Sequence, residues 1–316
     1  MDSTGTAFFF HDIFLRHDTG PYHPENFERL NGIVQGIKHA GLWEKLTHVE
    51  PVAATEDQIL LCHTKRHYDF IRECSQRGSV QIDPDTHVSA SSFDAALVAA
   101  GAAVQAVDGI LQGKYRNAFA AVRPPGHHAT ADCAMGFCLF NNIAVAARYA
   151  VEVCGLKRVL IMDWDVHHGN GTQDIFYNDP SVIYVSLHKK HHYPGTGWEH
   201  ETGEGAAKGT KFNFPLDRIT GTSTYEEYFS LALSRVAVFE PEFVMISCGF
   251  DAHQRDPLGN LGLKNETYAR LTRELMMFAS QFGHQRVFSI LEGGYDDQAL
   301  SHASAAHIHA LLNFNP

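Results

Sequence analysis

The stretch VLIMDWDVHHGNG, residues 159–171, begins as a short apolar run and ends in carboxylates, imidazoles and glycines. The apolar part is typical of a buried β-strand. Side chains alternate between the two faces of a strand, so Asp163, Asp165 and His167 are expected on one face. Buried carboxylates are costly unless a cation compensates them, and this pattern therefore predicts a metal site at a strand end.

A simpler interpretation is that these residues only cap surface loops. The chain has 21 histidines, so two adjacent ones are weak evidence by themselves. The alternation D-x-D-x-H directly after an apolar strand favours the metal site over the surface loop.

Composition limits the class of protein. The chain has 316 residues, 44% of them hydrophobic, and a net charge of −11. This size suits one large α/β domain over residues 1–316, without linker, repeat or low-complexity segment. The acidity argues against direct binding of nucleic acid. Six cysteines without a C-x-x-C pair, and no recognisable signal or membrane-spanning run, lead us to expect a cytoplasmic protein with no membrane partner.

Apolar strand-like runs recur at 7–10, 118–122, 159–163, 182–187, 243–248 and 287–291, and most are followed by a polar loop and a helical pattern. This alternation predicts a mostly parallel central sheet with helices on both faces. Ligands of such sheets bind outside the carboxyl ends of the strands. The residues expected to converge there are His127, His128, Asp165, His167, Asp251 and Tyr295.

Two local features lead to further predictions. Thr224 and Glu227 form a capping-box pattern that predicts the start of a helix. Arg29 interrupts the apolar stripe of an earlier helix, and it is either a solvated arginine or an inward one that holds an anion or backbone carbonyls near the site.

Asp165, Asp251 and His167 together make an oxygen-rich set of three ligands with open positions, which is typical of a catalytic divalent metal. Such an ion activates water and polarises a carbonyl group. A histidine pair for proton transfer and a tyrosine beside the developing oxyanion complete a site for hydrolysis of an amide or ester.

Seven segments together resemble the histone deacetylase family, within the arginase–deacetylase superfamily. They are RPPGHHA (123–129), GFCLFNN (136–142), DWDVHHGNGT (163–172), SLHK (186–189), PGTG (194–197), GFDAHQRDPLG (249–259) and LEGGY (291–295). The opening HPE-x-x-x-RL, residues 23–30, resembles the class II branch. The resemblance extends from about residue 11 to 300 and implies an arginase/deacetylase-like fold.

The resemblance implies one zinc ion per chain, bound by Asp165, His167 and Asp251. It also implies a potassium ion with a structural or modulatory role beside the zinc. The residues that match the potassium site are Asp163, Asp165, His167, Ser186 and Leu187.

The resemblance also implies the catalytic roles. His128 would be the general base that activates the attacking water and later protonates the leaving amine. His127 would be its electrostatic partner, hydrogen-bonded to Asp163. Tyr295 would stabilise the tetrahedral intermediate. Asn170 stands where many members have a second aspartate, and it gives His128 a neutral partner.

The substrate channel is matched by Gly136 and Phe137, while Gly293 and Gly294 of the LEGGY segment are predicted to contact substrate. The wall opposite Phe137 is usually phenylalanine in the family. Tyr193 takes that place, in a loop that looks shorter than usual. The sequence therefore leaves undecided which acyl group the protein prefers.

The predicted function is zinc-dependent removal of acetyl or other acyl groups from lysine side chains of a peptide or protein. An alternative is hydrolysis of acetylated polyamines or other small acetylated amines. Some family members of that kind carry a glutamate at the position of Leu258, and leucine favours acyl-lysine. Two further alternatives are a non-catalytic acyl-lysine-binding module and a two-metal ureohydrolase of the arginase type.

Overall fold

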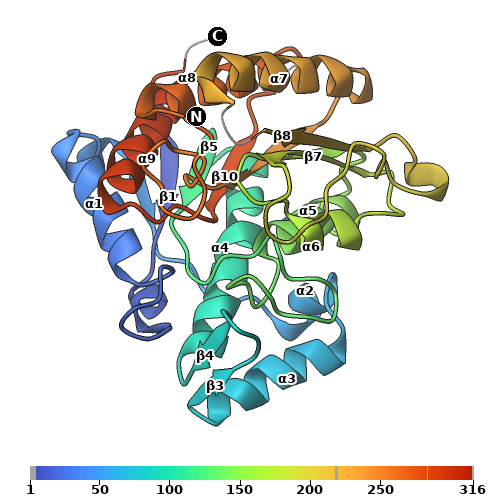
Figure 1. The fold of residues 1–316 in the computed structure, drawn as a ribbon. Helices are drawn as coiled ribbons and strands as arrows, with labels where there is room; N and C mark the ends of the chain where they lie inside the picture. Colours follow the sequence, from blue (N-terminus) through green and yellow to red (C-terminus); the bar gives the residue numbers. More distant parts are fainter. Residues whose placement is uncertain (1–4, 218–219, 283, 315–316) are drawn as a thin grey trace.

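An eight-stranded sheet forms the centre of the molecule (Figure 1). The computed structural model describes residues 5–217, 220–282 and 284–314. The strand order is β2-β1-β5-β10-β9-β6-β7-β8, and every neighbouring pair is parallel. The strands are β1 (Thr6–Phe9), β2 (Thr47–Val49), β5 (Asn117–Ala120), β6 (Val159–Asp163), β7 (Val182–Lys189), β8 (Lys211–Leu216), β9 (Phe243–Cys248) and β10 (Val287–Leu291). The predicted α/β class with a mostly parallel sheet is confirmed.

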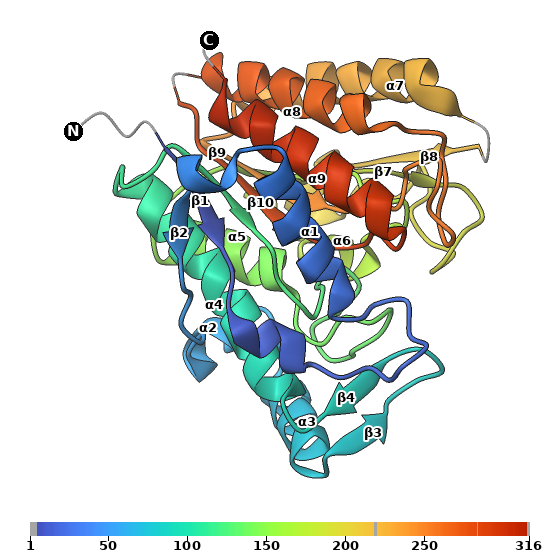
Figure 2. The same ribbon diagram turned by 90° about the vertical axis from the view of Figure 1, so that its left-hand side faces the viewer.

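Helices cover both faces of this sheet, as predicted (Figure 2). One layer consists of α1 (Glu28–His39), α7 (Gly221–Val236), α8 (Asn265–Ser280) and α9 (Asp297–Leu312). The other contains α4 (Ser92–Leu111), α5 (Asn142–Glu152) and α6 (Asn170–Ile175). Beyond α4 lie α2 (Glu56–Leu60), α3 (Lys65–Gln76) and an antiparallel hairpin of β3 (Ser79–Gln81) and β4 (His87–Ser89).

Helix α4 is a core helix. Its length and composition would allow it to cross a membrane, but 72% of its most apolar window is buried inside the protein. Small residues allow close packing: a Cβ atom on Gly101 would lie 2.0 Å from the carbonyl oxygen of Val52. Glycine at position 101 is therefore required by the segment packed against the helix, and most of the helix's alanines are buried in the core.

The predicted capping box at Thr224 and Glu227 is wrong. Helix α7 already begins at Gly221, so Thr224 lies in its first turn, and Thr220 at the N-cap makes no side-chain capping bond. The backbone N–H of Gly221 instead donates to the carbonyl oxygen of Leu261 at 3.0 Å. A contact with a distant loop satisfies this end of the helix in place of a local side chain.

The sheet order explains how the site is assembled. Strands β5, β10, β9 and β6 are consecutive neighbours and run in the same direction. The segments that follow these four strands therefore emerge side by side at one edge of the sheet.

Candidate active site

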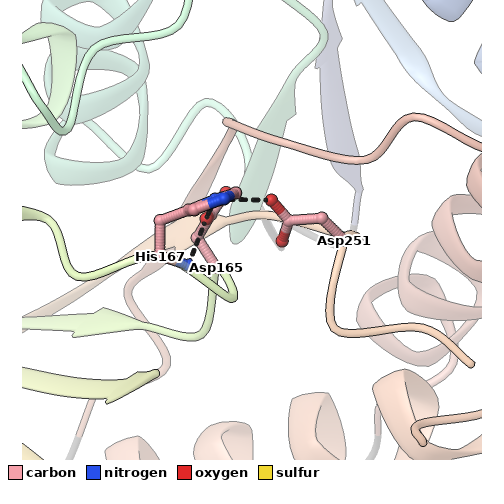
Figure 3. A group of neighbouring side chains, drawn as sticks. All are labelled: Asp165, His167 and Asp251. Atoms are coloured by element: carbon pink, nitrogen blue, oxygen red, sulfur yellow. Dashed lines mark hydrogen bonds and ion pairs between the residues drawn. The ribbon is translucent and has the colours of Figure 1, made fainter. Parts of the chain in front are cut away.

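Two carboxylates and one imidazole meet where β6 and β9 end (Figure 3). Nδ1 of His167 lies 3.0 Å from Oδ1 of Asp165 and 3.1 Å from Oδ2 of Asp251. One ligand atom from each residue lies within 4.8 Å of the other two, and all three residues are buried. Strand β6 ends at Asp163, so Asp165 and His167 come from the bend after it.

This group has the chemistry of a divalent metal site. Oδ2 of Asp251 is buried and its contact with Nδ1 of His167 lacks hydrogen-bond geometry, so among the described residues this oxygen accepts no hydrogen bond. Burial and the charge of Asp165 raise the pKa of Asp251, so the pair of carboxylates is electrostatically unfavourable as it stands. A cation would relieve this, and two carboxylates with one imidazole suit a catalytic divalent ion.

Backbone groups orient the ligands. Oδ2 of Asp165 accepts a hydrogen bond from the N–H of Gly293 at 2.8 Å, and Oδ1 of Asp251 accepts one from the N–H of Val166 at 2.8 Å. Such bonds hold ligand side chains in position before an ion binds.

The histidine pair lies on the segment that follows β5. His127 Nδ1 lies 3.0 Å from Oδ2 of Asp163, as predicted. Burial lowers the pKa of His127, but the carboxylates of Asp165, Asp163 and Glu292 raise it to about 10. His127 is therefore cationic at neutral pH.

His128 has the opposite surroundings. Its Nδ1 lies 2.8 Å from Oδ1 of Asn170. Burial, together with the neighbouring imidazoles of His127 and His167, lowers the pKa of His128 well below its usual value. Two adjacent histidines whose pKa values are shifted apart suit different proton-transfer roles.

Tyr295 follows β10 and is held from both sides. Its N–H donates to Oδ2 of Asp256 at 2.7 Å. The Arg29 guanidinium carbon lies 5.0 Å from the centre of its ring. Burial raises the pKa of Tyr295 well above its usual value, so the hydroxyl remains protonated as a hydrogen-bond donor.

Arg29 is buried, and the inward interpretation of this residue is confirmed. Its Nε donates to the carbonyl oxygen of Gly294 at 2.7 Å, and its Nη2 donates to that of Glu292 at 2.6 Å. Its Nη1 lies 2.9 Å from Oε1 of Glu25. Arg29 thus fixes the backbone just before Tyr295.

A cavity of about 650 Å³ opens over these groups. Most of the predicted catalytic and substrate-binding residues line it: His127, His128, Tyr295, Gly136, Phe137, Tyr193, Leu258 and Gly293. The predicted metal ligand His167 lines it too, whereas Asp163 and Asn170 lie behind the histidine pair, to which they bond. Gly294 does not line it, and its carbonyl oxygen binds Arg29 instead. The prediction that Gly294 contacts substrate therefore has no support in the cavity geometry.

The cavity wall is aromatic and tightly packed. The Tyr193 ring centre lies 5.0 Å from that of His128, and the Phe137 ring centre lies 5.9 Å from that of Tyr295. A Cβ atom on Gly136, whose φ is +55°, would lie 2.5 Å from Cδ2 of His128. Glycine is therefore required beside the histidine.

The residues of the predicted potassium site also lie close to the metal ligands. Asp163 pairs in register with Ser186 on the neighbouring strand β7, and Leu187 follows it. Oδ2 of Asp163 accepts a hydrogen bond from the Tyr184 hydroxyl at 2.9 Å, while Oγ of Ser186 lies 2.8 Å from Nδ1 of His188.

Several functional contacts were missed from sequence. Glu292 binds the histidine segment, Asp256 binds the backbone of Tyr295, and Glu25 forms a buried ion pair with Arg123. Asp85 lines the cavity. The available signal was a charged residue at the end of an apolar strand, as Glu292 is in LEGGY, but local sequence does not identify its partner.

Comparison with known proteins agrees with this geometry. The family profile described as "Histone deacetylase domain" matches residues 23–311. A "Probable deacetylase" of Archaeoglobus fulgidus is 37% identical over 98% of this chain and 87% of that protein. "Polyamine deacetylase HDAC10" of Mus musculus is 35% identical over 98% of this chain and 48% of its own length.

Plant proteins are similar as well. "Histone deacetylase 15" of Arabidopsis thaliana is 39% identical over 93% of this chain, which spans only 53% of that protein. The solved structure titled "Crystal Structure of HDA15 HD domain" superposes with a TM-score of 0.93 at 38% identity, covering 98% of this chain and 90% of the other.

Proposed function

The chain belongs to the histone deacetylase family and is a hydrolase of the deacetylase type, and from this premise we propose that it deacetylates lysine side chains with a zinc ion bound by Asp165, His167 and Asp251. One observation carries the proposal. His167 of the ligand group, the histidine pair and Tyr295 line one cavity with an aromatic wall, and Asp165 and Asp251 lie directly beside His167. That combination suits an extended acyl-amine chain whose amide reaches the metal ligands.

The residues divide the chemistry among them. When bound, a divalent ion supplies Lewis acidity that activates water and polarises the amide carbonyl. His128 donates Nδ1–H to Asn170, which leaves the lone pair of Nε2 free to take a proton from the attacking water. The same Nε2 then returns that proton to the leaving amine. The Tyr295 hydroxyl donates to the carbonyl oxygen as negative charge develops.

His127 stabilises developing charge, and the aromatic walls of the cavity exclude solvent. His127, whose cationic form is favoured by the carboxylates of Asp165 and Asp163, stabilises the negative charge that forms during attack. Phe137 and Tyr193 enclose the alkyl stem of the substrate and exclude bulk water from the amide.

A potassium ion beside the zinc is part of the proposal. Asp163, Asp165, His167, Ser186 and Leu187 would hold it. The proposal is supported by the buried carboxylates at the end of β6 and by the register of Asp163 with Ser186. A monovalent cation there would offset their negative charge.

Acyl-lysine in a polypeptide is the preferred substrate class because Leu258, an apolar residue, lines the cavity. Acetylated polyamines are the second candidate. The mouse relative is named a polyamine deacetylase, and Asp85 offers a carboxylate on the cavity wall that could pair with a distant ammonium group.

The test uses the zinc-loaded full chain. We expect a higher kcat/KM on an acetyl-lysine peptide than on acetylputrescine or acetylspermidine, and no turnover after chelation of the metal. The reverse order of substrates would favour the polyamine alternative. Zinc-loaded protein that turns over none of a panel of acyl-lysine peptides and acetylated amines would contradict hydrolysis and support a binding module.

A further inference from the structure

We propose that Glu292 is a positioning residue, whose carboxylate holds the segment bearing His127 and His128 in register with the segment bearing Tyr295. The inference rests on the proposed function, because it concerns how those groups are aligned. Glu292 itself does not line the substrate cavity.

The carboxylate of Glu292 is fully buried and used on both oxygens. Its Oε2 accepts hydrogen bonds from the N–H of Gly126 at 2.7 Å and from the N–H of His127 at 3.1 Å. Its Oε1 accepts one from the Ser247 hydroxyl at 3.2 Å. The ion pairs that arginine and lysine form among the described residues all involve other carboxylates. A buried carboxylate held by backbone N–H groups fixes the backbone that donates to it.

The segment that carries Glu292 is itself immobilised. The N–H of Glu292 donates to the carbonyl oxygen of Cys248 at 3.3 Å, and its own carbonyl oxygen accepts a bond from Arg29 at 2.6 Å. The next residue, Gly293, donates to the metal-ligand candidate Asp165 at 2.8 Å. The side chain of Glu292 therefore extends from a backbone segment that is held in place.

Glu292 joins three parts of the site directly. Its main chain belongs to the Tyr295 segment, its neighbour Gly293 holds Asp165, and its side chain holds the backbone of His127. In a reaction that needs the base and the oxyanion donor on the same amide, a displacement of about 1 Å can cost roughly 100-fold in rate. The Glu292 carboxylate opposes such a displacement because it bonds directly from the Tyr295 segment to the backbone of the histidine segment.

Two matched variants distinguish the effect of the side-chain length of residue 292 from the effect of its charge. Glu292→Gln keeps the length: its amide oxygen can accept both N–H bonds and its amide nitrogen can donate to Ser247 Oγ. Glu292→Asp keeps the charge but is shorter by one methylene, so its carboxylate cannot meet Gly126 and His127 without movement of the backbone. Both variants leave a polar side chain in the buried position, and both are expected to fold.

The two variants are expected to differ in kcat. On an acetyl-lysine peptide, Glu292→Gln should stay within roughly fivefold of the wild type, whereas Glu292→Asp should lose about 100-fold in kcat with little change in KM. Zinc content should remain one ion per chain in both. Ser289→Ala is the control, because Ser289 lies on the same strand, is buried, and bonds to His307 and to the carbonyl oxygen of Ala118 on β5, but not to residues 123–129. Its kcat should be unchanged.

Amide hydrogen exchange gives a readout that does not depend on activity. The N–H groups of Gly126 and His127 should exchange at least tenfold faster in Glu292→Asp than in wild type or Glu292→Gln. Equal kcat and equal exchange in Glu292→Asp and wild type would overturn the proposal, as would a loss in Glu292→Gln as large as that in Glu292→Asp. If the wild type hydrolyses no acyl substrate, the proposed function fails, and the exchange data alone decide whether Glu292 fixes this segment.

Discussion

Nδ1 of His128 donates a hydrogen bond to Oδ1 of Asn170 at 2.8 Å, so the proposed general base has an uncharged partner. Burial and the neighbouring imidazoles of His127 and His167 lower the pKa of His128 well below its usual value, and they outweigh the hydrogen bond to Asn170, which raises it. The base is then deprotonated and competent over a wide pH range that extends to acidic conditions.

Replacing Asn170 by Asp should narrow that range. A carboxylate stabilises the protonated imidazole and raises the pKa of His128, so the base becomes protonated at a higher pH. The acidic limb of the kcat/KM profile should therefore move upward by about one pH unit. A pH–rate profile of both proteins measures this, and an acidic limb that does not move would contradict the role of His128.

Replacing Tyr295 by Phe should impair catalysis without affecting metal binding. Loss of one oxyanion donor costs about 2.7–4 kcal/mol, or roughly 100- to 1000-fold in kcat. Steady-state kinetics and zinc analysis on the same sample test this. Unchanged turnover would show that the Tyr295 hydroxyl is not the donor.

Replacing Asp251 by Ala should abolish high-affinity zinc binding, because only Asp165 and His167 remain of the three ligands. The wild type should lose activity with a chelator and regain it with zinc, and a hydroxamate should inhibit it. Metal analysis after dialysis gives the result directly. Full zinc occupancy and activity in Asp251→Ala would show that the assigned ligand set is wrong.

Glu25 should make stability depend on acid pH. Burial raises the pKa of Glu25, but the guanidinium groups of Arg123 and Arg29 lower it to about 2, from an ordinary value of 4.5. Because the folded-state pKa is depressed, the stabilisation is complete above about pH 4.5 and is lost as the pH falls towards 2. The linked free energy of unfolding is about 3 kcal/mol.

Urea unfolding of wild type and Glu25→Gln across this pH range measures that linkage. The difference in stability between the two proteins should shrink as the pH falls, since the wild-type carboxylate becomes neutral as well. A difference that stays constant from neutral to acid pH would contradict the assignment.

Replacing Leu258 by Glu should shift substrate preference towards acetylated polyamines. Leu258 lines the cavity, and a carboxylate there would attract a second ammonium group. A single charge pair near 4 Å in water is worth about 1 kcal/mol, or roughly fivefold in the ratio of kcat/KM for acetylspermidine to that for an acetyl-lysine peptide. Leu258→Gln is the matched uncharged control, and an equal shift in both variants would rule out the charge as the cause.

The position of the site in the fold follows from the sequence through one rule of parallel sheets. The carboxyl ends of parallel strands share an edge, so residues after β5, β6, β9 and β10 were correctly expected to meet. The alternation of side chains along β6 predicted the positions of the site residues only in part. The strand ends at Asp163, whose carboxylate binds His127, while Asp165 and His167 join Asp251 from the following bend.

Contacts between distant segments were beyond sequence reasoning. Glu292 and Gly126 are 166 positions apart, and Arg29 and Gly294 are 265 apart. No local pattern distinguishes which buried charge will find which backbone group. For the same reason the start of α7 was misplaced, because its first N–H binds the loop at Leu261 and not a local cap.

The last strand, β10, lies between β5 and β9 in the interior of the sheet. Before residues 287–291 have been synthesised, β5 and β9 are therefore unpaired edge strands, although they are joined through β10 in the complete sheet. The chain at that stage also lacks Tyr295. Pairing of β10 with β5 closes a loop of about 170 residues, which is a slow event for a parallel sheet. The onset of catalysis would thus report that synthesis has passed Tyr295 and that β10 has paired with its neighbours, and a ribosome-bound fragment that ends before β10 should be inert and prone to pair with other chains.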